Sequence, residues 1–296
     1  MTPRSRCPSC ARPIPWHENI PLLSFLFLRG RCRGCGAPIS WRYPIVEALT
    51  GALFLAAAWL LVVRFPGGWR EPGRWVHLAA GWVLLGDFVA LTFIDLDHRL
   101  LPDRLTKPGM AAGAIFSVLH PSLQRTEWLP SVPEGGAALL LSVAGMVLGY
   151  GSLWLVGWAG EKALRKEAMG LGDAKLLAMV GAFCGPLGVL LAAFAGFVLG
   201  ILLGLAQLAR TGDNAFPFGP ALAAGGAAAF LAPRPLAEGI LALVDLLHGR
   251  WGPAAMTLVL GFLLLLIRRK VPRGLFLALA AAMIPIAALA VAQLLR

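Results

Sequence analysis

The sequence predicts an all-α membrane protein with a small metal-binding head. Hydrophobic residues make up 58% of the 296 residues and charged residues only 14%, whereas soluble domains carry about 25% charged residues. Long apolar runs recur along the chain, with short polar connections between them. Two Cys-x-x-Cys pairs lie in a polar segment near the N-terminus. The runs predict membrane helices, and the cysteine pairs predict the head.

The polar head comprises residues 1–43. Cys7 and Cys10 form its first pair, and Cys32 and Cys35 form its second. Two tight turns that each deliver two thiolates suit tetrahedral Zn²⁺, and four cysteine ligands leave no open position for a catalytic water. We therefore predict a structural zinc site, which would help fold a segment too short to bury much of a core. Disulfides and unused thiols are the alternatives.

The rest of the chain predicts a helical bundle of about nine membrane spans. A helix needs about 20 apolar residues to cross a bilayer. The main bundle of membrane helices is assigned to 44–232. Residues 233–296 are assigned to a C-terminal extension with an interfacial amphipathic helix and two extra spans. We detect no internal repeat in the chain. The candidate spans lie at about 44–64, 76–94, 104–119, 136–158, 174–189, 190–209, 218–232, 252–267 and 274–294.

The positive charge of the chain indicates its topology. A net charge of +11 is also found in proteins that bind nucleic acid. However, most of the 26 Lys and Arg residues fall on the side of the head when the predicted spans alternate across the membrane. Cytoplasmic loops carry this excess of Lys and Arg. We therefore expect a cytoplasmic head, contact with membrane lipid and no nucleic-acid partner.

Two acidic residues interrupt the apolar runs. Asp95 closes one run and Asp173 opens another, where it follows Gly170 and Gly172 in a Gly-x-Gly-Asp sequence. A charge near hydrocarbon costs roughly 2.5–3.5 kcal/mol even on the mildest scale. Both acids lie at helix ends on the predicted cytoplasmic side. Two such costs in one protein indicate that the carboxyl groups act together.

A facing pair of carboxyl groups can hydrolyse a peptide without a metal. Like charges that are close together cannot both ionise easily, so one group keeps a proton. The charged group can then take a proton from water while the protonated group donates to the carbonyl oxygen. Asp95 and Asp173 are the predicted catalytic residues. Gly170 and Gly172 are predicted to let the backbone approach an extended substrate.

Helix capping or solvation is the alternative interpretation of these acids. We prefer it for Asp97, as a loop acid, and for Asp103, as the cap of a helix that starts near Arg104. Glu47, which follows Arg42, is expected to pair with an arginine of the head and so tie the head to the bundle. No serine, histidine and aspartate arrangement, phosphate loop or dinucleotide fingerprint is found in the sequence.

Several motifs make the chain resemble the type IV prepilin peptidase family, whose members are aspartic peptidases of the Gly-x-Gly-Asp class. The resemblance covers roughly residues 7–225, and the motifs come in the order of the family. They are Cys7-Pro-Ser-Cys10, Asn19-Ile-Pro-Leu-Leu-Ser24, Arg29-Gly-Arg-Cys32 and Cys35, Ile39-Ser-Trp-Arg-Tyr-Pro-Ile-Val-Glu47, Phe93-Ile-Asp-Leu-Asp-His98, Leu100-Leu-Pro-Asp-Arg-Leu-Thr106, Met169-Gly-Leu-Gly-Asp-Ala-Lys-Leu-Leu177 and Pro217-Phe-Gly-Pro220.

The resemblance implies a particular activity. It implies that the chain lies in the bacterial inner membrane and cuts the leaders of type IV prepilins and of pseudopilins of type II secretion. Cleavage would occur at the cytoplasmic face, after a Gly and before a residue that is usually Phe, with Asp95 and Asp173 as the catalytic pair. Many members also methylate the new N-terminus with S-adenosylmethionine, an activity associated with the cysteine head and zinc.

Methyl transfer is left open by one departure from the family pattern. Members usually begin with a further membrane helix carrying Gly-Ser-Phe-Leu-Asn before the first cysteine pair, whereas this chain begins six residues before Cys7. The alternative function is a zinc-headed membrane adaptor or transporter that hydrolyses nothing. The missing helix and the two extra C-terminal spans favour that alternative, whereas the positions of the acids at helix ends favour the peptidase.

Overall fold

The computed structural model describes residues 5–64, 68–124, 126–164, 170–211 and 217–248. Within these ranges the chain is helical and contains no β-strand, only two isolated β-bridges in the head. The predicted all-α class is therefore confirmed. The chain divides into two compact units, residues 1–89 and 90–296, and we describe each by itself.

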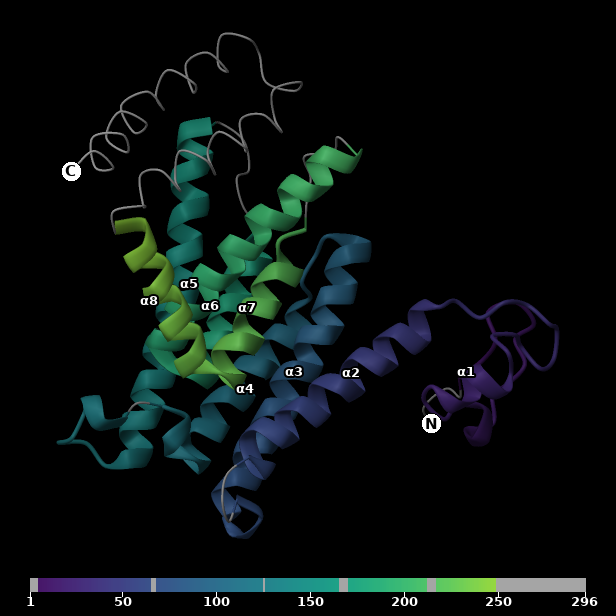
Figure 1. Ribbon diagram of the computed structural model, residues 1–296, viewed down its shortest axis with the longest axis horizontal. Helices are drawn as coiled ribbons and strands as arrows, with labels where there is room; N and C mark the ends of the chain where they lie inside the picture. The colour runs from purple at the N-terminus through teal and green to yellow at the C-terminus, as the bar shows by residue number, and fades with distance from the viewer. Residues whose placement is uncertain (1–4, 65–67, 125, 165–169, 212–216, 249–296) are drawn as a thin grey trace. The chain divides into compact units, whose positions relative to one another are not determined.

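The first unit contains the head and the helices that follow it (Figure 1). Phe54 of α2 stacks on Trp82 of α3 with 5.5 Å between ring centroids, and the Trp82 indole N–H donates to the Phe54 carbonyl at 3.1 Å. These two contacts join the long helices of the unit. The elements are the 3₁₀ turn η1 (Trp16–Glu18), α1 (Leu23–Phe27), α2 (Arg42–Ala58), its π-helical continuation η2 (Trp59–Val63), the 3₁₀ turn η3 (Gly68–Arg70) and the first part of α3 (Pro72–His98).

The second unit is a bundle built on very close helix contacts. A Cβ added to Gly181 of α6 would lie 2.2 Å from the Gly145 carbonyl oxygen of α5, and one added to Gly225 of α7 would lie 2.4 Å from the Ala192 carbonyl oxygen of α6. Small residues let membrane helices approach in this way. The elements are the end of α3, α4 (Asp103–Leu119), η4 (Pro121–Leu123), η5 (Thr126–Trp128), α5 (Glu134–Leu164), α6 (Leu171–Thr211), α7 (Gly219–Leu231) and α8 (Pro233–His248).

The long helix α6 is broken at Gly185. This residue has φ 66° and ψ −171°, and Pro186 follows it. Proline has no N–H to continue the helical ladder, and glycine tolerates the left-handed region. The sequence predicts two spans here, 174–189 and 190–209. Two helical halves are present, but the break comes earlier than predicted because the Gly-Pro pair sets its position.

Buried polar side chains satisfy the carbonyl groups left free at this break. The Ser142 and Ser117 hydroxyls donate to the Ala182 carbonyl at 2.8 and 3.0 Å. The Gln124 amide nitrogen donates to the Phe183 carbonyl at 3.2 Å. The last carbonyls of a helix have no partner within the helix, and in an apolar interior each needs one. Side chains from other elements therefore stabilise the break in α6.

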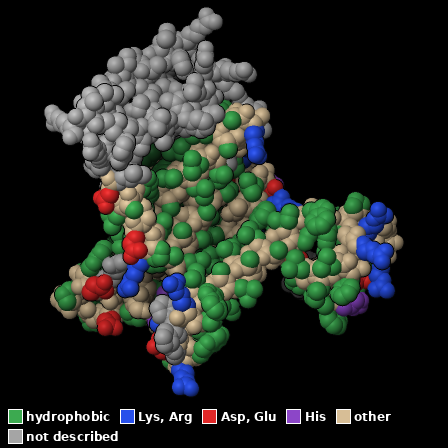
Figure 2. Space-filling model, in the orientation of Figure 1, with side chains coloured by type: hydrophobic (Ala, Val, Ile, Leu, Met, Phe, Trp, Pro, Cys, Tyr) green, Lys and Arg blue, Asp and Glu red, His purple; other side chains and the backbone are tan. Residues whose placement is uncertain are grey.

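Four helical segments are long and apolar enough to cross a membrane, namely 42–63, 72–98, 134–159 and 171–210. α4 and α7 match two more of the predicted spans but have only 17 and 13 residues. Apolar side chains cover much of the visible surface of the described chain (Figure 2), as expected for an integral membrane protein. The predicted count of nine spans is not confirmed, because 252–267 and 274–294 lie outside the described residues.

The first part of the predicted C-terminal extension is helical. α8 covers most of the stretch that the sequence assigns to an interfacial helix, and its Leu241 and Leu243 are exposed. Its place at the membrane surface stays a prediction, as does the division of the chain at residues 43 and 232.

Candidate active site

Asp95 lies in the last turn of α3 and is almost fully buried, with 6% of its surface exposed. The carboxyl oxygen Oδ2 accepts a hydrogen bond from the Gly219 N–H at 3.1 Å. Gly219 is the first residue of α7, where backbone N–H groups lack intrahelical partners and the helix dipole favours negative charge. A Cβ at position 219 would lie only 2.5 Å from Oδ2. The carboxyl group therefore fills the space that the glycine leaves.

Asp173 lies in the first turn of α6 and is half-buried. Its backbone N–H donates to the Gly170 carbonyl at 3.2 Å. Its carboxyl group is close enough to that of Asp95 for the two charges to interact. The two acids that the sequence singles out, 78 positions apart, therefore come together in the second unit.

The break in α6 makes this meeting possible. Phe218, next to Gly219, packs on Phe197 with 5.2 Å between ring centroids and lies against Gly200. In a straight helix, Asp173 and Gly200 would be about 40 Å apart. Since Asp95 interacts with both Gly219 and Asp173, the chain must double back at Gly185. The first half of α6 thus carries Asp173, and the second half packs against the start of α7, whose Gly219 binds Asp95.

The two glycines of the Gly-x-Gly-Asp sequence have different surroundings. A Cβ at Gly172 would lie 3.0 Å from the Leu101 Cβ, so this glycine allows close packing of the α3–α4 connection. Among the described residues, a Cβ at Gly170 would meet no neighbour closer than 4.0 Å. The contact of Gly170 with a substrate stays a prediction.

Asp103 does not cap α4 as the sequence predicts. The helix begins at Asp103 itself, its N-cap is Pro102, and no side chain caps it. The Asp103 carboxylate instead accepts from the ammonium groups of Lys175 at 2.5 Å and Lys107 at 2.8 Å. Hydrogen bonds from Lys107 and Lys175 hold the pKa of Asp103 below its usual value. The sequence interpretation missed Lys175 because the ion pair joins residues that are far apart in the chain.

Asp97 also differs from its predicted setting. It lies within the last turn of α3, because the helix continues to His98 rather than ending near residue 94. The side chain is exposed. The prediction that it is a solvated acid is compatible with this exposure, whereas the prediction that it lies in a loop is wrong.

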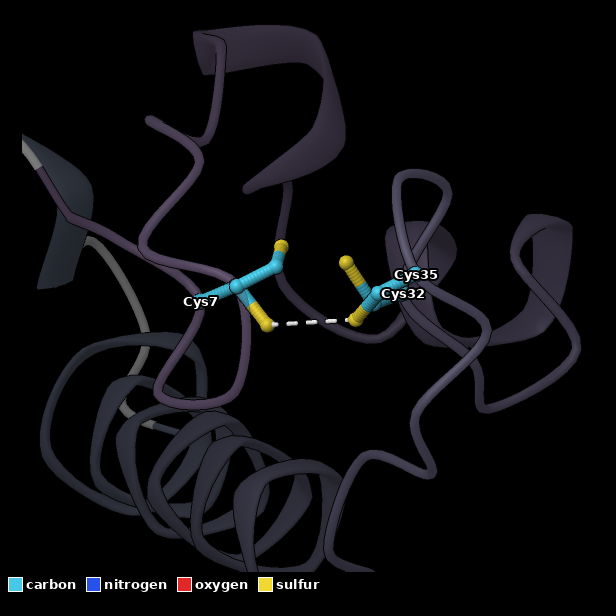
Figure 3. Close-up of side chains that lie close together, drawn as sticks. Cys7, Cys32 and Cys35 are labelled. Atoms are coloured by element: carbon cyan, nitrogen blue, oxygen red, sulfur yellow. Dashed lines mark hydrogen bonds between the residues drawn. The ribbon is translucent and has the colours of Figure 1, made fainter.

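In the first unit, the four head cysteines form one cluster. All four sulfur atoms lie within 4.8 Å of one another, and the Cys7 and Cys35 sulfurs are 3.9 Å apart. Figure 3 shows the side chains of Cys7, Cys32 and Cys35 pointing toward one another. Zinc with four thiolates at about 2.3 Å places the sulfurs about 3.8 Å apart, whereas a disulfide needs about 2.05 Å. The donor set therefore fits a zinc ion.

The head contains a nine-residue repeat that the sequence interpretation missed. Residues 6–14 and 31–39 share the pattern Arg-Cys-x-x-Cys-x-x-Pro-Ile. Each copy folds into the same turn, in which the N–H of the first cysteine donates to the carbonyl five residues later, at 3.0 Å in the first copy and 2.8 Å in the second. A β-bridge closes each copy at the same positions. The two halves of the metal centre are thus equivalent.

Two glutamates fix the head. Glu18 accepts from Arg12 at 3.3 Å and from Arg33 at 3.4 Å, so it joins the two cysteine turns. The Glu47 carboxylate accepts from the backbone N–H of Leu22 at 2.7 Å. The sequence predicts an arginine partner for Glu47, but this hydrogen bond ties the head to α2 through a backbone amide.

A cavity of about 360 Å³ lies within the head. Its polar lining includes Glu18, Asn19, Arg33 and Glu47, and the ring of Tyr43 also lines it. Small-molecule sites combine an apolar wall with a few polar groups in a space of this size. The head therefore holds a candidate ligand site next to the cysteine cluster.

The fold and sites define an all-helical integral membrane protein with a four-cysteine head and a pair of acids from two separate helices. Residues 1–61 match the model of the bacterial peptidase A24 N-terminal domain, and residues 82–205 match that of the type IV leader peptidase family. The chain belongs to this family. The cysteine cluster lies in the first match, and both acids lie in the second.

Curated relatives agree with this membership. A prepilin leader peptidase/N-methyltransferase of Aeromonas hydrophila is 45% identical over 235 residues, which cover 78% of this chain and 72% of the relative. Proteins of the same name from Xanthomonas campestris pv. campestris and Neisseria gonorrhoeae are 40% and 37% identical, over 78% and 76% of this chain and over 73% and 70% of their own lengths. No solved structure matches the chain.

Proposed function

We propose that this protein is a prepilin leader peptidase in which Asp95 and Asp173 are the catalytic pair. The observation that carries the proposal is the meeting of the two carboxyl groups in a family whose curated members are named for this activity. The substrates would be type IV prepilins or pseudopilins. A non-hydrolytic adaptor or transporter accounts less well for a buried and a half-buried acid whose carboxyl groups interact at the ends of two helices.

The chemistry follows from the pair. Because the charges of the two carboxyl groups interact, one group would hold a proton while the other is charged. The charged group takes a proton from a water molecule as the water attacks the scissile carbonyl carbon. The protonated group donates to the carbonyl oxygen, and a tetrahedral intermediate forms. The Gly219 N–H holds the Asp95 carboxyl group in place during these steps.

We infer that the site faces the cytoplasm from the inner membrane. Lys and Arg residues are concentrated in the predicted connections on the side of the head, which indicates the cytoplasmic side. Asp95 and Asp173 lie at the ends of α3 and α6 that this topology puts on that side. The site would then lie where the polar leader of a prepilin meets the membrane.

A cleavage assay tests the proposed activity. Purified protein in detergent is incubated with a purified prepilin, and the product is analysed by mass spectrometry. The peptidase predicts a shorter product cut after a Gly, whereas an adaptor or transporter would leave the prepilin intact.

Methyl transfer is a second function that the cavity in the head favours. S-adenosylmethionine carries a sulfonium methyl group that an amine can accept. We propose that the cavity binds this molecule, with Glu18, Asn19 and Glu47 offering acceptors for its hydroxyl and ammonium groups and Arg33 a cation for its carboxylate. Zinc on Cys7, Cys10, Cys32 and Cys35 would be structural and would hold the cavity wall in shape.

Mass spectrometry also tests methyl transfer. The N-terminus of the cleaved product should gain 14 mass units (the replacement of one hydrogen by a methyl group) only when S-adenosylmethionine is present. An unmethylated product under both conditions would limit the protein to proteolysis.

A further inference from the structure

An ion pair joins the two segments that carry the acids. Asp103 is the first residue of α4 and follows Asp95 by eight positions, and Lys175 follows Asp173 by two. Their charged groups are 2.5 Å apart. Close to this pair, Leu101 packs on Gly172. The α3–α4 connection is therefore attached directly to the start of α6.

The attachment matters because the pair of acids works only at a short distance. A displacement of about 1 Å at a reacting group can cost about 10²-fold in rate. Asp95 is held by Gly219 of α7, but no hydrogen bond from α7 to Asp173 is found in the described residues. The contacts of Leu101 with Gly172 and of Asp103 with Lys175 connect the start of α6, which carries Asp173, to the residues that follow Asp95.

We propose that the Asp103–Lys175 ion pair positions Asp173 against Asp95, so that Asp103 and Lys175 are positioning residues for peptide cleavage. This inference rests on the proposed function. Within the part of the chain that the structure describes, neither side chain has a hydrogen bond or ion pair with Asp95 or Asp173. Their role is to keep the two carboxyl groups at the separation at which they share one proton.

Lys107 provides a matched control within the same cluster. It binds the same Asp103 carboxylate, at 2.8 Å, but from the next turn of the same helix. Its side chain is 67% exposed, whereas that of Lys175 is 26% exposed. Removing Lys107 therefore takes one charge from Asp103 and leaves the connection between α4 and α6 intact.

The test compares Lys175→Met, Lys107→Met and Asp103→Asn in full-length protein, with kcat and KM measured on a prepilin. We expect Lys175→Met and Asp103→Asn to lower kcat at least about 10-fold with KM changed less than about twofold, because only the geometry of the acids changes. Lys107→Met should keep kcat within about twofold. Thermal unfolding in detergent should differ little between the two lysine variants, because partly exposed ion pairs contribute little to stability.

Two further variants keep the proposal falsifiable if one substitution harms folding. Lys175→Arg preserves the ion pair and should retain most of kcat. Exchange of the charges, Asp103→Lys with Lys175→Asp in the Lys107→Met background, should recover at least part of the kcat lost by Lys175→Met. Equal kcat values for Lys175→Met and Lys107→Met, or no recovery on exchange, would overturn the positioning role.

Asp95→Asn separates this inference from the proposed function. If Asp95→Asn still cleaves, the catalytic assignment fails and the positioning role fails with it. If Asp95→Asn is inactive and Lys175→Met cleaves like the wild-type protein, only the positioning role is wrong.

Discussion

At the residue scale, Gly219 is as important to the site as the acids themselves. Asp95 and Asp173 could be predicted because a carboxylate in an apolar run is costly and therefore stands out. Gly219 could not be predicted, because its role depends on a contact 124 positions away in the chain. Its motif, Pro217-Phe-Gly-Pro220, marks the position but not the partner. Lys175 was missed for the same reason.

Substitution of Gly219 by alanine should impair cleavage. The added Cβ would lie 2.5 Å from the Asp95 carboxyl oxygen, so the carboxyl group must move, and we expect kcat to fall by roughly 10²-fold. Gly151→Ala is the control, because a Cβ there meets no described residue within 4 Å. Cleavage of a prepilin by both variants is the measurement, and wild-type activity in Gly219→Ala would contradict the described contact.

The repeat in the head predicts a stabilising substitution. Ala11 has φ 56°, and the equivalent residue of the second turn is Gly36 with φ 70°. An alanine in this left-handed region is strained by roughly 1–2 kcal/mol, whereas a glycine is not. Ala11→Gly should therefore stabilise the folded head by about 1 kcal/mol through relief of this strain. The extra chain entropy of glycine in the unfolded state reduces this gain.

Zinc affinity measures this effect, since metal binding and folding of the head are coupled. Competition with a chelator should show tighter zinc binding by Ala11→Gly than by the wild-type protein. Gly36→Ala, the reverse change in the other turn, should weaken binding. Weaker binding by Ala11→Gly would show that the two turns are not equivalent.

At the element scale, the break in α6 decides where the acids lie. The sequence predicts two spans in this region but divides them after residue 189, because hydropathy alone does not register a Gly-Pro pair inside an apolar run. The polar groups of Ser117, Gln124 and Ser142 that satisfy the break come from other elements. Such long-range hydrogen bonds leave no periodic signal in the sequence.

The ion pair between α4 and α6 predicts a pH dependence of stability. Because the lysines lower the pKa of Asp103 in the folded protein, the carboxylate stabilises the fold above its unfolded pKa of about 3.9. This contribution is lost as the pH falls through the lower folded pKa. Lys175→Met should be less stable than the wild-type protein by a small, constant margin above about pH 5.

Thermal unfolding in detergent between pH 3 and pH 7 measures this margin. It should shrink below about pH 4, as Asp103 becomes protonated in both proteins. A margin that grows as the pH falls would have the wrong sign and would contradict the ion pair.

At the scale of the whole molecule, sequence patterns predicted the class better than the count of spans. The low charge content and repeated apolar runs identified an all-helical membrane protein, and the described helices match seven of the nine predicted runs. Hydropathy gave no reliable span count, because α4 and α7 are short and α6 doubles back. The cysteine cluster was predictable because its ligands are spaced regularly in one short segment.

The separation of the chain into two units predicts distinct effects of zinc removal. The cysteine cluster belongs to residues 1–89, and both acids belong to residues 90–296. A chelator that strips zinc should therefore unfold the head and abolish any methyl transfer. The bundle should stay folded and cleave a prepilin within about twofold of its normal rate. Prompt loss of cleavage, with the bundle still folded, would contradict a metal-independent mechanism.

The central claim is that Asp95 and Asp173 share one catalytic task, and prepilin cleavage by three aspartate variants tests it most directly. Asp95→Asn and Asp173→Asn should each reduce cleavage below detection, while the thermal unfolding temperature of each variant stays close to that of the wild-type protein. Asp97→Asn, which changes an exposed acid two positions from Asp95, should cleave normally. Cleavage that persists in Asp95→Asn or in Asp173→Asn would contradict the account.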